Sequence, residues 1–488
     1  LNKNKNREFT MTSAGVLHQS GNESEFDYIV VGAGSAGCVV ASRLAEEKAG
    51  SVLLIEAGNA ADKNPETMSA DGFIQAFSND NTMWDRLSQP QNACGERRMY
   101  VGTGTGMGGS GAVNGMVYTR GDQQDFAQWP QGWQWNDVAP WFERLEQRLR
   151  VKTRAPVRFT ETGMEAALAA GFKKKNELND GALCGFIGYQ LMNYDGDRRR
   201  SSYMSFVRDL VCENLIVKTD CKVTKILFDA NKRACGIMVF EGGRYIQMNA
   251  RQEIILCAGA LETPKLLMLS GVGPQSLLQS LQIAVVLDAP AVGKNLQDHP
   301  NVCLFYRGKQ SPDAFYPQVY GFDRMNSVLP LPPQQADTCF VFYSAPASIK
   351  QSMQRMLPAL ALPPGQFHNK RLRALLKQLV NIGFMVPFTR QFVAKLFGIV
   401  VILGKPLSRG EVRIVSRDPD VPAAIDPGFY ADAQDMDTMI NGVLKAQQIL
   451  AQESFRRWGN TPLSGGARTQ SREKIKRWIH GATMTTFH

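Results

Sequence analysis

The feature that most constrains the fold of this chain is a short apolar run that leads directly into three closely spaced glycines. The run YIVV has the β-branched composition of a buried parallel strand. Gly32, Gly34 and Gly37 follow it in G-x-G-x-x-G spacing, and an apolar helical pattern comes next. A second apolar run ends at Glu56, so residues 27–56 predict a compact β-α-β unit. Such a unit is typical of a doubly wound α/β domain.

Each part of this unit has a physical role in binding a dinucleotide. The first glycine permits the tight turn, the second lets a pyrophosphate approach the backbone, and the third lets the helix pack closely on the strand. The helix N-terminus offers unpaired N–H groups to the phosphates. Glu56 can accept hydrogen bonds from a ribose diol and would repel the 2′-phosphate of NADP. The unit therefore predicts a site for FAD or NAD, and the alternative is a glycine-rich turn in an unrelated α/β protein.

A second glycine cluster favours FAD. Seven glycines fall between Gly102 and Gly115, which is too many for the interior of a strand or helix. So many small residues suit a backbone that is wrapped against a large flat ligand. A mobile loop is the alternative, but the run from Val113 to Tyr118 that follows has the composition of ordered structure.

Composition narrows the remaining classes. The chain has 488 residues, of which 44% are hydrophobic and 20% charged, which predicts two to three globular domains. The net charge of +10 is dispersed apart from residues 198–200 and 370–377. We interpret these charges as a solvated surface and expect no nucleic-acid partner. Nine cysteines without a C-x-x-C pair indicate neither a disulfide framework nor a zinc site. No apolar run approaches the roughly 18 residues of a membrane span.

Three stretches together resemble the glucose-methanol-choline (GMC) oxidoreductase family. They are DYIVVGAGSAG, GGSGAVNGMVYTRG and GALETPKLLMLSGVG. Further matches lie at residues 129–146, 292–300 and 406–414, so the resemblance extends over most of residues 27–488. It implies an α/β protein, with a Rossmann-like FAD-binding domain and a second α+β substrate domain built on an antiparallel sheet.

The resemblance also implies which residues contact FAD: a pyrophosphate loop, a ribose acid, a flavin-covering stretch, a segment along the isoalloxazine ring and a backbone position at the adenine. The corresponding residues here are Gly32, Gly34, Ser35, Ala36, Gly37, Glu56, Ala57, Trp84, Met107, Gly108, Asn114, Gly115, Met116, Val117 and Val223. Residues 103–105 depart from the family's common Arg-Gly-Lys, and Gly111 from a usual Ser. Val113 stands where members with histidyl-linked FAD carry His, so we expect non-covalent FAD and no metal.

The catalytic base implied by the resemblance is His488. The preceding MTTF matches the entry to the family's Thr-x-x-His-Pro-x-Gly-Thr motif, whose His takes the hydroxyl proton of an alcohol while a hydride passes to flavin N5. Without the resemblance a terminal His would rank lowest, because chain ends are usually frayed. His299 is interpreted as structural, at a domain junction. Family members continue beyond this motif, so we expect a truncated C-terminal segment.

The predicted organisation has an N-terminal tail, two interleaved domains and a C-terminal catalytic segment. The tail spans 1–25, the FAD-binding domain 26–150 and 200–300, the substrate domain 151–199 and 301–465, and the C-terminal segment 466–488. Strands of an antiparallel sheet are expected near residues 318–325, 337–345 and 397–406.

The predicted function is FAD-dependent oxidation of a small alcohol to an aldehyde or ketone, of choline-dehydrogenase-like type. The electron acceptor is a quinone, a dye-like acceptor or oxygen, and a dehydrogenase is favoured over an oxidase. An FAD-containing lyase of the same fold and a non-catalytic flavin-binding remnant remain alternatives. A cytoplasmic location is expected, with contact at the inner membrane left open. The basic, apolar helical stretch 371–397 could touch a membrane or a quinone, but a packed helix with a solvated basic face is favoured.

Overall fold

The computed structural model describes residues 9–11, 17–19 and 24–488. Strands β1 (Phe9–Met11) and β2 (Leu17–Gln19) pair antiparallel. The tail was expected over residues 1–25; its last residue, Glu25, begins β3, and residues 1–8, 12–16 and 20–23 lie outside the described residues.

A six-stranded sheet is built around the β-α-β unit, and the strand order is β15-β4-β3-β18-β17-β16. Its first four strands are parallel, and the last two extend it as an antiparallel hairpin. Helix α1 (Ser35–Glu46) crosses from β3 to β4 on one face of this sheet. The strands are β3 (Glu25–Val31), β4 (Val52–Ile55), β15 (Leu215–Lys218), β16 (Lys222–Phe228), β17 (Ala234–Glu241) and β18 (Arg244–Leu256). The α/β class predicted from the glycine loop is confirmed.

An eight-stranded sheet forms the other half of the molecule and is antiparallel except at one edge. Its three predicted strands are confirmed within a few residues. The strands are β11 (Lys173–Lys174), β12 (Phe186–Tyr189), β22 (Pro300–Arg307), β23 (Val319–Asp323), β24 (Thr338–Ser344), β25 (Leu396–Leu403), β28 (Thr461–Pro462) and β29 (Met484–Thr485).

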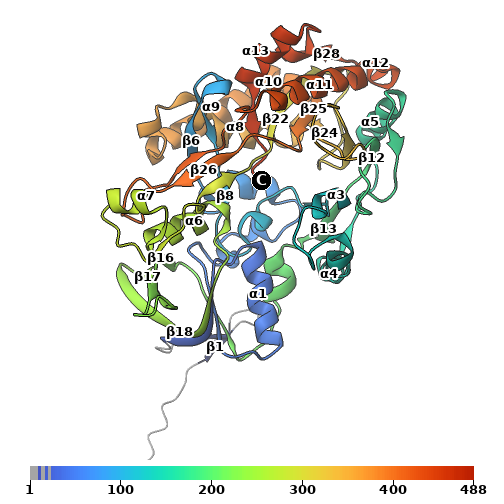
Figure 1. Ribbon diagram of the computed structural model, residues 1–488. Coiled ribbons are helices and arrows are strands. Elements are labelled where there is room, and N and C mark those ends of the chain that lie inside the picture. The colour runs from blue at the N-terminus through green and yellow to red at the C-terminus, as the bar shows by residue number, and fades with distance from the viewer. Residues whose placement is uncertain (1–8, 12–16, 20–23) are drawn as a thin grey trace, which may run out of the picture.

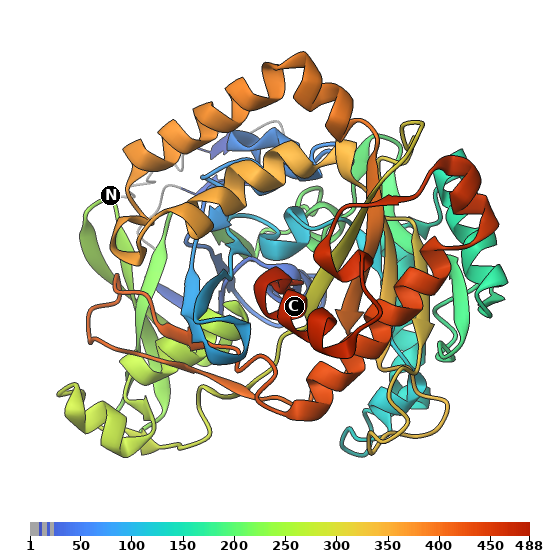
Figure 2. The same cartoon turned by 90° about the horizontal axis from the view of Figure 1, so that it is seen from above.

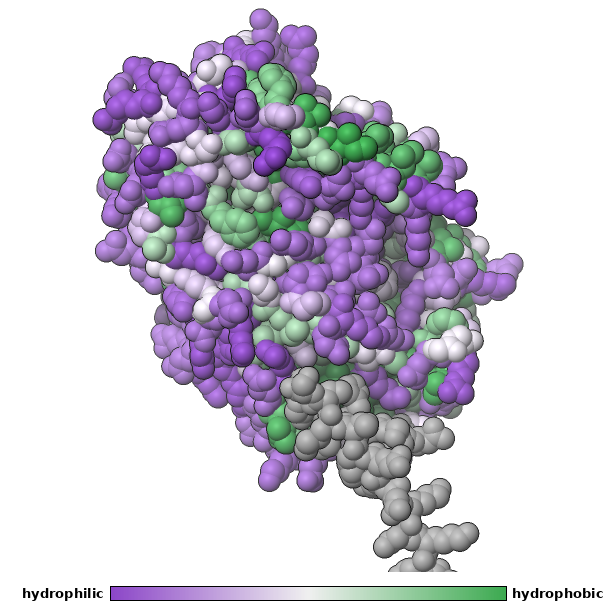
Figure 3. Space-filling view, turned by 180° about the vertical axis from the view of Figure 1, so that it is seen from behind, coloured by the Kyte–Doolittle hydropathy of each residue, from purple (hydrophilic) through white to green (hydrophobic). Residues whose placement is uncertain are grey.

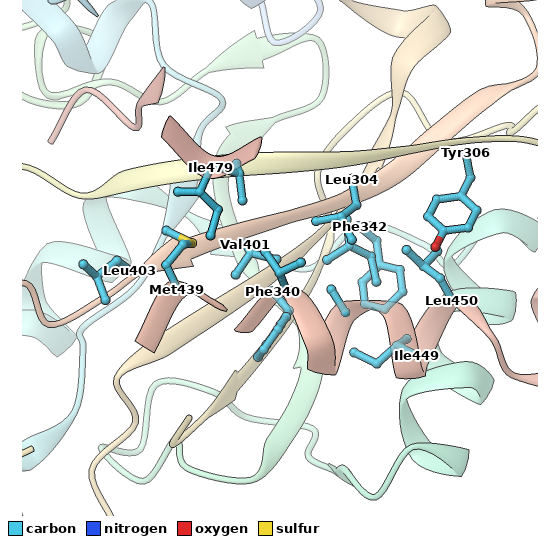
Figure 4. Packing of buried hydrophobic residues seen from close by; sticks show 14 of the residues in the cluster. Leu304, Tyr306, Phe340, Phe342, Val401, Leu403, Met439, Ile449, Leu450 and Ile479 are labelled. Carbon is cyan, nitrogen blue, oxygen red and sulfur yellow. The ribbon is translucent and has the colours of Figure 1, made fainter. Parts of the chain in front are cut away.

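The main hydrophobic core lies between this sheet and the helices α5 (Arg158–Ala169), α11 (Ala433–Leu450) and α13 (Arg472–Ala482). Figure 4 shows Phe340 and Val401 from neighbouring strands packed against Met439 of α11. The sequences of β22, β24 and β25 are almost continuously apolar, and nearly all of their residues are buried. Both faces of these strands are therefore covered.

Three helices lie in the chain between strands β24 and β25 of the antiparallel sheet. They are α8 (Ile349–Ala361), α9 (Lys370–Met385) and α10 (Pro387–Val393). Figure 2 shows α8 and α9 side by side at one margin of the molecule. The helix predicted over residues 371–397 therefore ends earlier than expected, because Pro387 opens a new helix and residue 396 begins β25.

The remaining elements connect the two sheets. The helices are α2 (Phe73–Ser78), α3 (Gln123–Phe126), α4 (Trp135–Leu149), α6 (Gly259–Leu269), α7 (Gln275–Ser280) and α12 (Glu453–Trp458). The strands are β5 (Met83–Trp84), β6 (Leu87–Gln91), β7 (Arg97–Tyr100), β8 (Thr103–Gly104), β9 (Val117–Tyr118), β10 (Val151–Lys152), β13 (Leu191–Asp195), β14 (Arg198–Arg199), β19 (Val272–Gly273), β20 (Leu287–Asp288), β21 (Lys294–Leu296), β26 (Gly410–Arg413) and β27 (Ala424–Asp426).

The C-terminus lies in the middle of the molecule, between the two sheets (Figures 1 and 2). Within the described ranges, no helix combines the length and the apolar character that crossing a bilayer requires.

Candidate functional site

A cavity of about 740 Å³ opens at the carboxyl ends of β3 and β4. This edge of an open α/β sheet is where ligands of such folds bind. Its walls come from the β3–α1 turn, the end of β4, residues 84–110, the start of α6 and Phe487. Eight of the predicted cofactor residues line it: Gly32, Gly34, Ser35, Ala36, Glu56, Ala57, Trp84 and Val223.

The three glycines of the first loop meet different surroundings. A Cβ atom at Gly32 would lie 2.6 Å from the carbonyl oxygen of Cys257, and φ at Gly32 is +99°. A Cβ atom at Gly37 would lie 1.8 Å from the carbonyl oxygen of Gly32, so this glycine allows the helix to pack on the turn. At Gly34 the nearest such atom is 4.0 Å away. The middle glycine therefore leaves the backbone open to a ligand in the cavity.

The N-terminus of α1 faces the same space. Gly34 occupies the N-cap position, makes no side-chain cap hydrogen bond and is followed by no acidic residue in the first turn. In the part of the chain that the structure describes, no side chain caps the first N–H groups of the helix, and these groups carry the positive end of the helix dipole. This arrangement fits a pyrophosphate.

Glu56 is buried in the cavity wall and accepts three backbone hydrogen bonds. Its Oε2 accepts from the N–H of Ala33 at 2.8 Å, and its Oε1 accepts from Gly58 at 2.9 Å and Gly106 at 3.1 Å. Burial raises the pKa of the Glu56 carboxyl, and the backbone donors oppose this rise. A carboxylate has about four acceptor positions, so one remains for a ribose hydroxyl.

The cavity wall also carries an ion pair that the sequence did not reveal. Arg86 donates to Oε1 of Glu262 at 2.7 Å and to the hydroxyl of Thr103 at 2.7 Å, and its guanidinium lies 4.7 Å from the ring centroid of Trp84. The signal that was available is the position of Glu262 within the second GMC motif, GALETPKLLMLSGVG.

The other predicted flavin residues lie outside this cavity lining. Met107 and Met116 are buried in separate hydrophobic clusters, and the N–H of Gly108 donates to the carbonyl of Ala33 at 2.8 Å. Gly37, as described above, faces the turn. The predicted cofactor-binding residues that do not line the cavity are Gly37, Met107, Gly108, Asn114, Gly115, Met116 and Val117. In their place residues 103–105 and 109–110 contribute the glycine-rich wall.

Arg199 corrects the interpretation of residues 198–200 as solvated surface. Its side chain is fully buried and donates to the carbonyl of Gly111 at 3.0 Å, and to the amide oxygen and carbonyl of Asn114, each at 2.7 Å. Burial lowers the pKa of Arg199 to about 9, so the guanidinium stays charged at neutral pH. Arg199 thus holds the segment next to the cavity, although the run of three arginines looked like a basic patch.

His488, the predicted base, is held in place by backbone pairing. Its carbonyl accepts from the N–H of His299 at 3.0 Å, and Thr486 donates its N–H to the carbonyl of His299 at 3.0 Å. The preceding residue, Phe487, lines the cavity. The end of the chain is therefore paired with the start of β22 rather than frayed.

The ring of His299 lies against the ring of His488, with centroids 5.1 Å apart and planes at 86°. Burial, followed by the proximity of His488, lowers the pKa of His299 to about 4. The surrounding protein atoms also lower the pKa of His488, although its ring keeps contact with solvent. Both imidazoles are neutral at pH 7. His299, interpreted from sequence as structural, therefore contacts the predicted base.

Among the described residues, no group of three His, Cys, Asp or Glu side chains has an arrangement that could hold a metal ion. The cavity offers instead a helix N-terminus and a buried carboxyl group, and the two paired imidazoles lie next to Phe487 of its wall.

Two models of one protein family match this chain. A GMC oxidoreductase N-terminal model matches residues 26–301, and a GMC oxidoreductase C-terminal model matches residues 406–488. The chain belongs to the GMC oxidoreductase family. The resemblance found from the motifs is confirmed.

Relatives with assigned names support the same family. The chain is 31% identical to an oxygen-dependent choline dehydrogenase of Pectobacterium atrosepticum, over 95% of this chain and 84% of the relative. It is 29% identical to a protein of the same name from Sinorhizobium fredii, again over 95% and 84%.

Solved structures share the GMC fold. Pyridoxine 4-oxidase from Mesorbium loti superposes with a TM-score of 0.79 at 22% identity, covering 95% of this chain and 87% of that one. A formate oxidase gives a TM-score of 0.78 at 21% identity, covering 96% and 88%. At these identities the likeness concerns the fold. The predicted arrangement of an FAD-type α/β half and an antiparallel substrate half is confirmed.

Proposed function

We propose that this GMC oxidoreductase binds FAD without a covalent link and oxidises the CH–OH group of a small alcohol to an aldehyde or ketone. The observation that carries this proposal is a cavity lined by an uncapped helix N-terminus and by Phe487, whose neighbour His488 is one of two paired, neutral imidazoles. Relatives named as choline dehydrogenases support the substrate class. Oxygen, a quinone or a dye-like compound would accept the electrons.

The residues of the first loop fit FAD as a ligand. The open backbone at Gly34 and the first N–H groups of α1 would hold the pyrophosphate. The remaining acceptor position of Glu56 would bind the ribose, and Val223, in the cavity wall, would meet the adenine. Bound FAD supplies the hydride acceptor. Val113 is a buried aliphatic residue at the position that carries His in covalent members, which supports non-covalent binding.

His488 is proposed as the base. Its Nδ1 lies 2.9 Å from the carbonyl oxygen of Thr486. In the tautomer that donates Nδ1–H to this carbonyl, Nε2 is left to accept the hydroxyl proton of the substrate. A lowered pKa keeps the imidazole neutral at pH 7, as a base requires. The ring of His299 limits the orientations open to the ring of His488.

The domain division forms part of the same proposal. Residues 26–150 and 200–300 would form the FAD-binding domain, and this is supported by the six-stranded sheet, whose strands all come from residues 25–256. Residues 151–199 and 301–465 would form the substrate domain, and residues 466–488 would return to the cavity.

The test is an anaerobic titration of the FAD-loaded protein with a panel of small alcohols that includes choline. We expect at least one alcohol to bleach the oxidised flavin spectrum and to yield the matching carbonyl compound. Retained FAD with no bleaching by any alcohol would favour the non-catalytic remnant. Cleavage of a cyanohydrin without bleaching would favour the lyase.

The role of His488 is tested by His488→Ala. Because general base catalysis contributes roughly 10² to 10⁴ in rate, we expect flavin reduction to slow by that factor while the flavin spectrum is retained. His480→Ala is the matched control, because His480 lies in the last turn of α13 and outside the segment that pairs with β22. Near-full activity of His488→Ala would contradict the assignment.

A further inference from the structure

The hairpin formed by α8, α9 and α10 exposes a large apolar surface. Phe388 is 76% exposed and Met385 is 74% exposed, and six other large apolar side chains around them are also open to solvent. We call this set the hairpin face; its members are Met353, Leu360, Leu375, Leu379, Ile382, Met385, Val386 and Phe388. Figure 3 shows apolar residues gathered along the upper right margin, where the half-turn brings the hairpin of Figure 1. A surface of this kind marks an interaction site.

Helix α9 is amphipathic in the reverse sense to an ordinary surface helix. Leu375, Leu379 and Ile382 follow i, i+4, i+7 spacing, which places them on one stripe, and this stripe is exposed. On the opposite side of the helix Arg373 and Val380 are buried. A helix that only covers a protein core turns its apolar stripe inward, so packing within this chain does not explain the outward stripe.

Ion pairs attach the hairpin to the rest of the molecule, and these ion pairs do not involve residues of the hairpin face. Arg355, which is fully buried, donates to Asp80 at 2.9 Å and to Asp85 at 2.8 Å. Arg373 lies 2.5 Å from Asp85, and Lys377 lies 2.8 Å from Asp80. These contacts come from the inner side of α8 and α9. The exposed apolar residues are therefore available for another partner.

The chain segment that carries the hairpin face has charges of a single sign. Residues 338–410 contain ten Lys and Arg residues and no Asp or Glu. Three of the ten are used in the inner ion pairs with Asp80 and Asp85. Lys370 and Arg371, at the start of α9, and Arg390, in α10, are exposed. Exposed apolar side chains flanked by cations are the pattern of a helix that lies in the interface of an anionic bilayer.

We propose that the hairpin face docks on the surface of an anionic phospholipid bilayer. Phe388, Met385 and the stripe on α9 would enter the boundary between headgroups and acyl chains, and Lys370, Arg371 and Arg390 would contact the lipid phosphates. The absence of acidic residues from the segment favours a lipid surface over a second copy of the chain, because two such faces would bring like charges together. The proposal stands independently of the reaction that the site performs.

The experiment is co-sedimentation of the FAD-loaded protein with vesicles of equal parts phosphatidylglycerol and phosphatidylcholine. We expect binding to these vesicles, weaker binding to phosphatidylcholine alone and release at high salt. The double variant Met385→Glu with Phe388→Glu should lower binding about tenfold or more, because two large apolar side chains no longer enter the bilayer. Lys370→Glu with Arg371→Glu should lower binding to the anionic vesicles by a similar factor.

Val211→Glu is the control, because Val211 is 72% exposed and lies before β15, outside the hairpin. It should bind as the unaltered protein does. The altered side chains are exposed, so all variants should keep the same thermal unfolding midpoint. The proposal is overturned if the unaltered protein ignores anionic vesicles. It is also overturned if the unaltered protein binds no vesicles and forms, in sedimentation velocity, a dimer that is absent from the Met385→Glu, Phe388→Glu double variant.

Discussion

Two buried ionisable side chains hold the glycine-rich segment of residues 102–115 at different points, and they do so with opposite chemistry. Glu56 is a carboxyl group that accepts the N–H of Gly106 together with two other backbone donors. Arg199 is a cation that donates to the carbonyl of Gly111 and to Asn114. Of the described side chains, none of opposite charge forms an ion pair with either residue.

The comparison teaches how a segment without side chains acquires a defined shape. Glycines have no side chains to pack and many accessible backbone conformations, so the segment does not order itself. Instead its backbone N–H and C=O groups bind two buried side chains, and these side chains fix the backbone in return. The two differ in place: Glu56 lines the cavity, whereas Arg199 does not. Variants at the two positions should therefore separate cofactor affinity from loop stability.

The largest effect is expected for Glu56→Ala. It leaves three buried N–H groups without a partner, each at a cost of about 1 to 3 kcal/mol. We expect the free energy of unfolding to fall by about 3 kcal/mol or more, and FAD retention to weaken with no change of substrate preference. Urea unfolding and gel filtration of the FAD-loaded protein measure these effects. The exposed Glu213→Ala is the control, and unchanged FAD retention would argue against the ribose contact.

A smaller effect is expected for Arg199→Met. It removes three hydrogen bonds, but it also removes a buried charge whose desolvation is costly, so the net loss in the free energy of unfolding should be about 2 kcal/mol. Arg199→Lys keeps the charge without the planar guanidinium, so its free energy of unfolding should lie between those of the unaltered protein and Arg199→Met. Arg198→Lys, on the exposed neighbour, should match the unaltered protein. If Arg199→Lys lost as much free energy of unfolding as Arg199→Met, the geometry of the guanidinium and not its charge would order the segment.

The smallest effect distinguishes the two charges by pH. Because burial raises the pKa of Glu56, the folded state binds its proton more tightly than the unfolded state does. The stability that this group contributes is therefore highest below its ordinary pKa of 4.5 and falls as pH rises above it. We expect the free energy of unfolding of the unaltered protein, relative to Glu56→Gln, to decrease between pH 4.5 and neutral pH. The opposite slope would mean that the backbone donors outweigh burial. Arg199, whose pKa is lowered, contributes no slope in this range.

Local patterns in the chain were sufficient for the parts of the site that lie close together in sequence. Gly32, Gly34 and Gly37 occupy the three environments that their spacing predicted, and Glu56 stands in the cavity wall. The strands around residues 319–323, 338–344 and 396–403 were also predictable, because continuous apolar runs of this length form buried strands.

Contacts between distant segments were not predictable in this way. Arg199 looked like surface because its two neighbours are cations, yet it meets Asn114, 85 residues earlier in the chain. His299 meets His488 only because β29 pairs with the start of β22. The outward stripe of α9 has the periodicity of any amphipathic helix, and its direction became clear only from the buried Arg373 and the ion pairs to Asp80 and Asp85.

Periodicity and glycine spacing thus established the β-α-β unit, the family and the dinucleotide loop, since each depends on residues within a few turns of one another. The burial of Arg199, the pairing of the two imidazoles and the orientation of the hairpin depend on which segments the folded chain brings together. Burial and desolvation act on that assembled structure, and no local pattern encodes them.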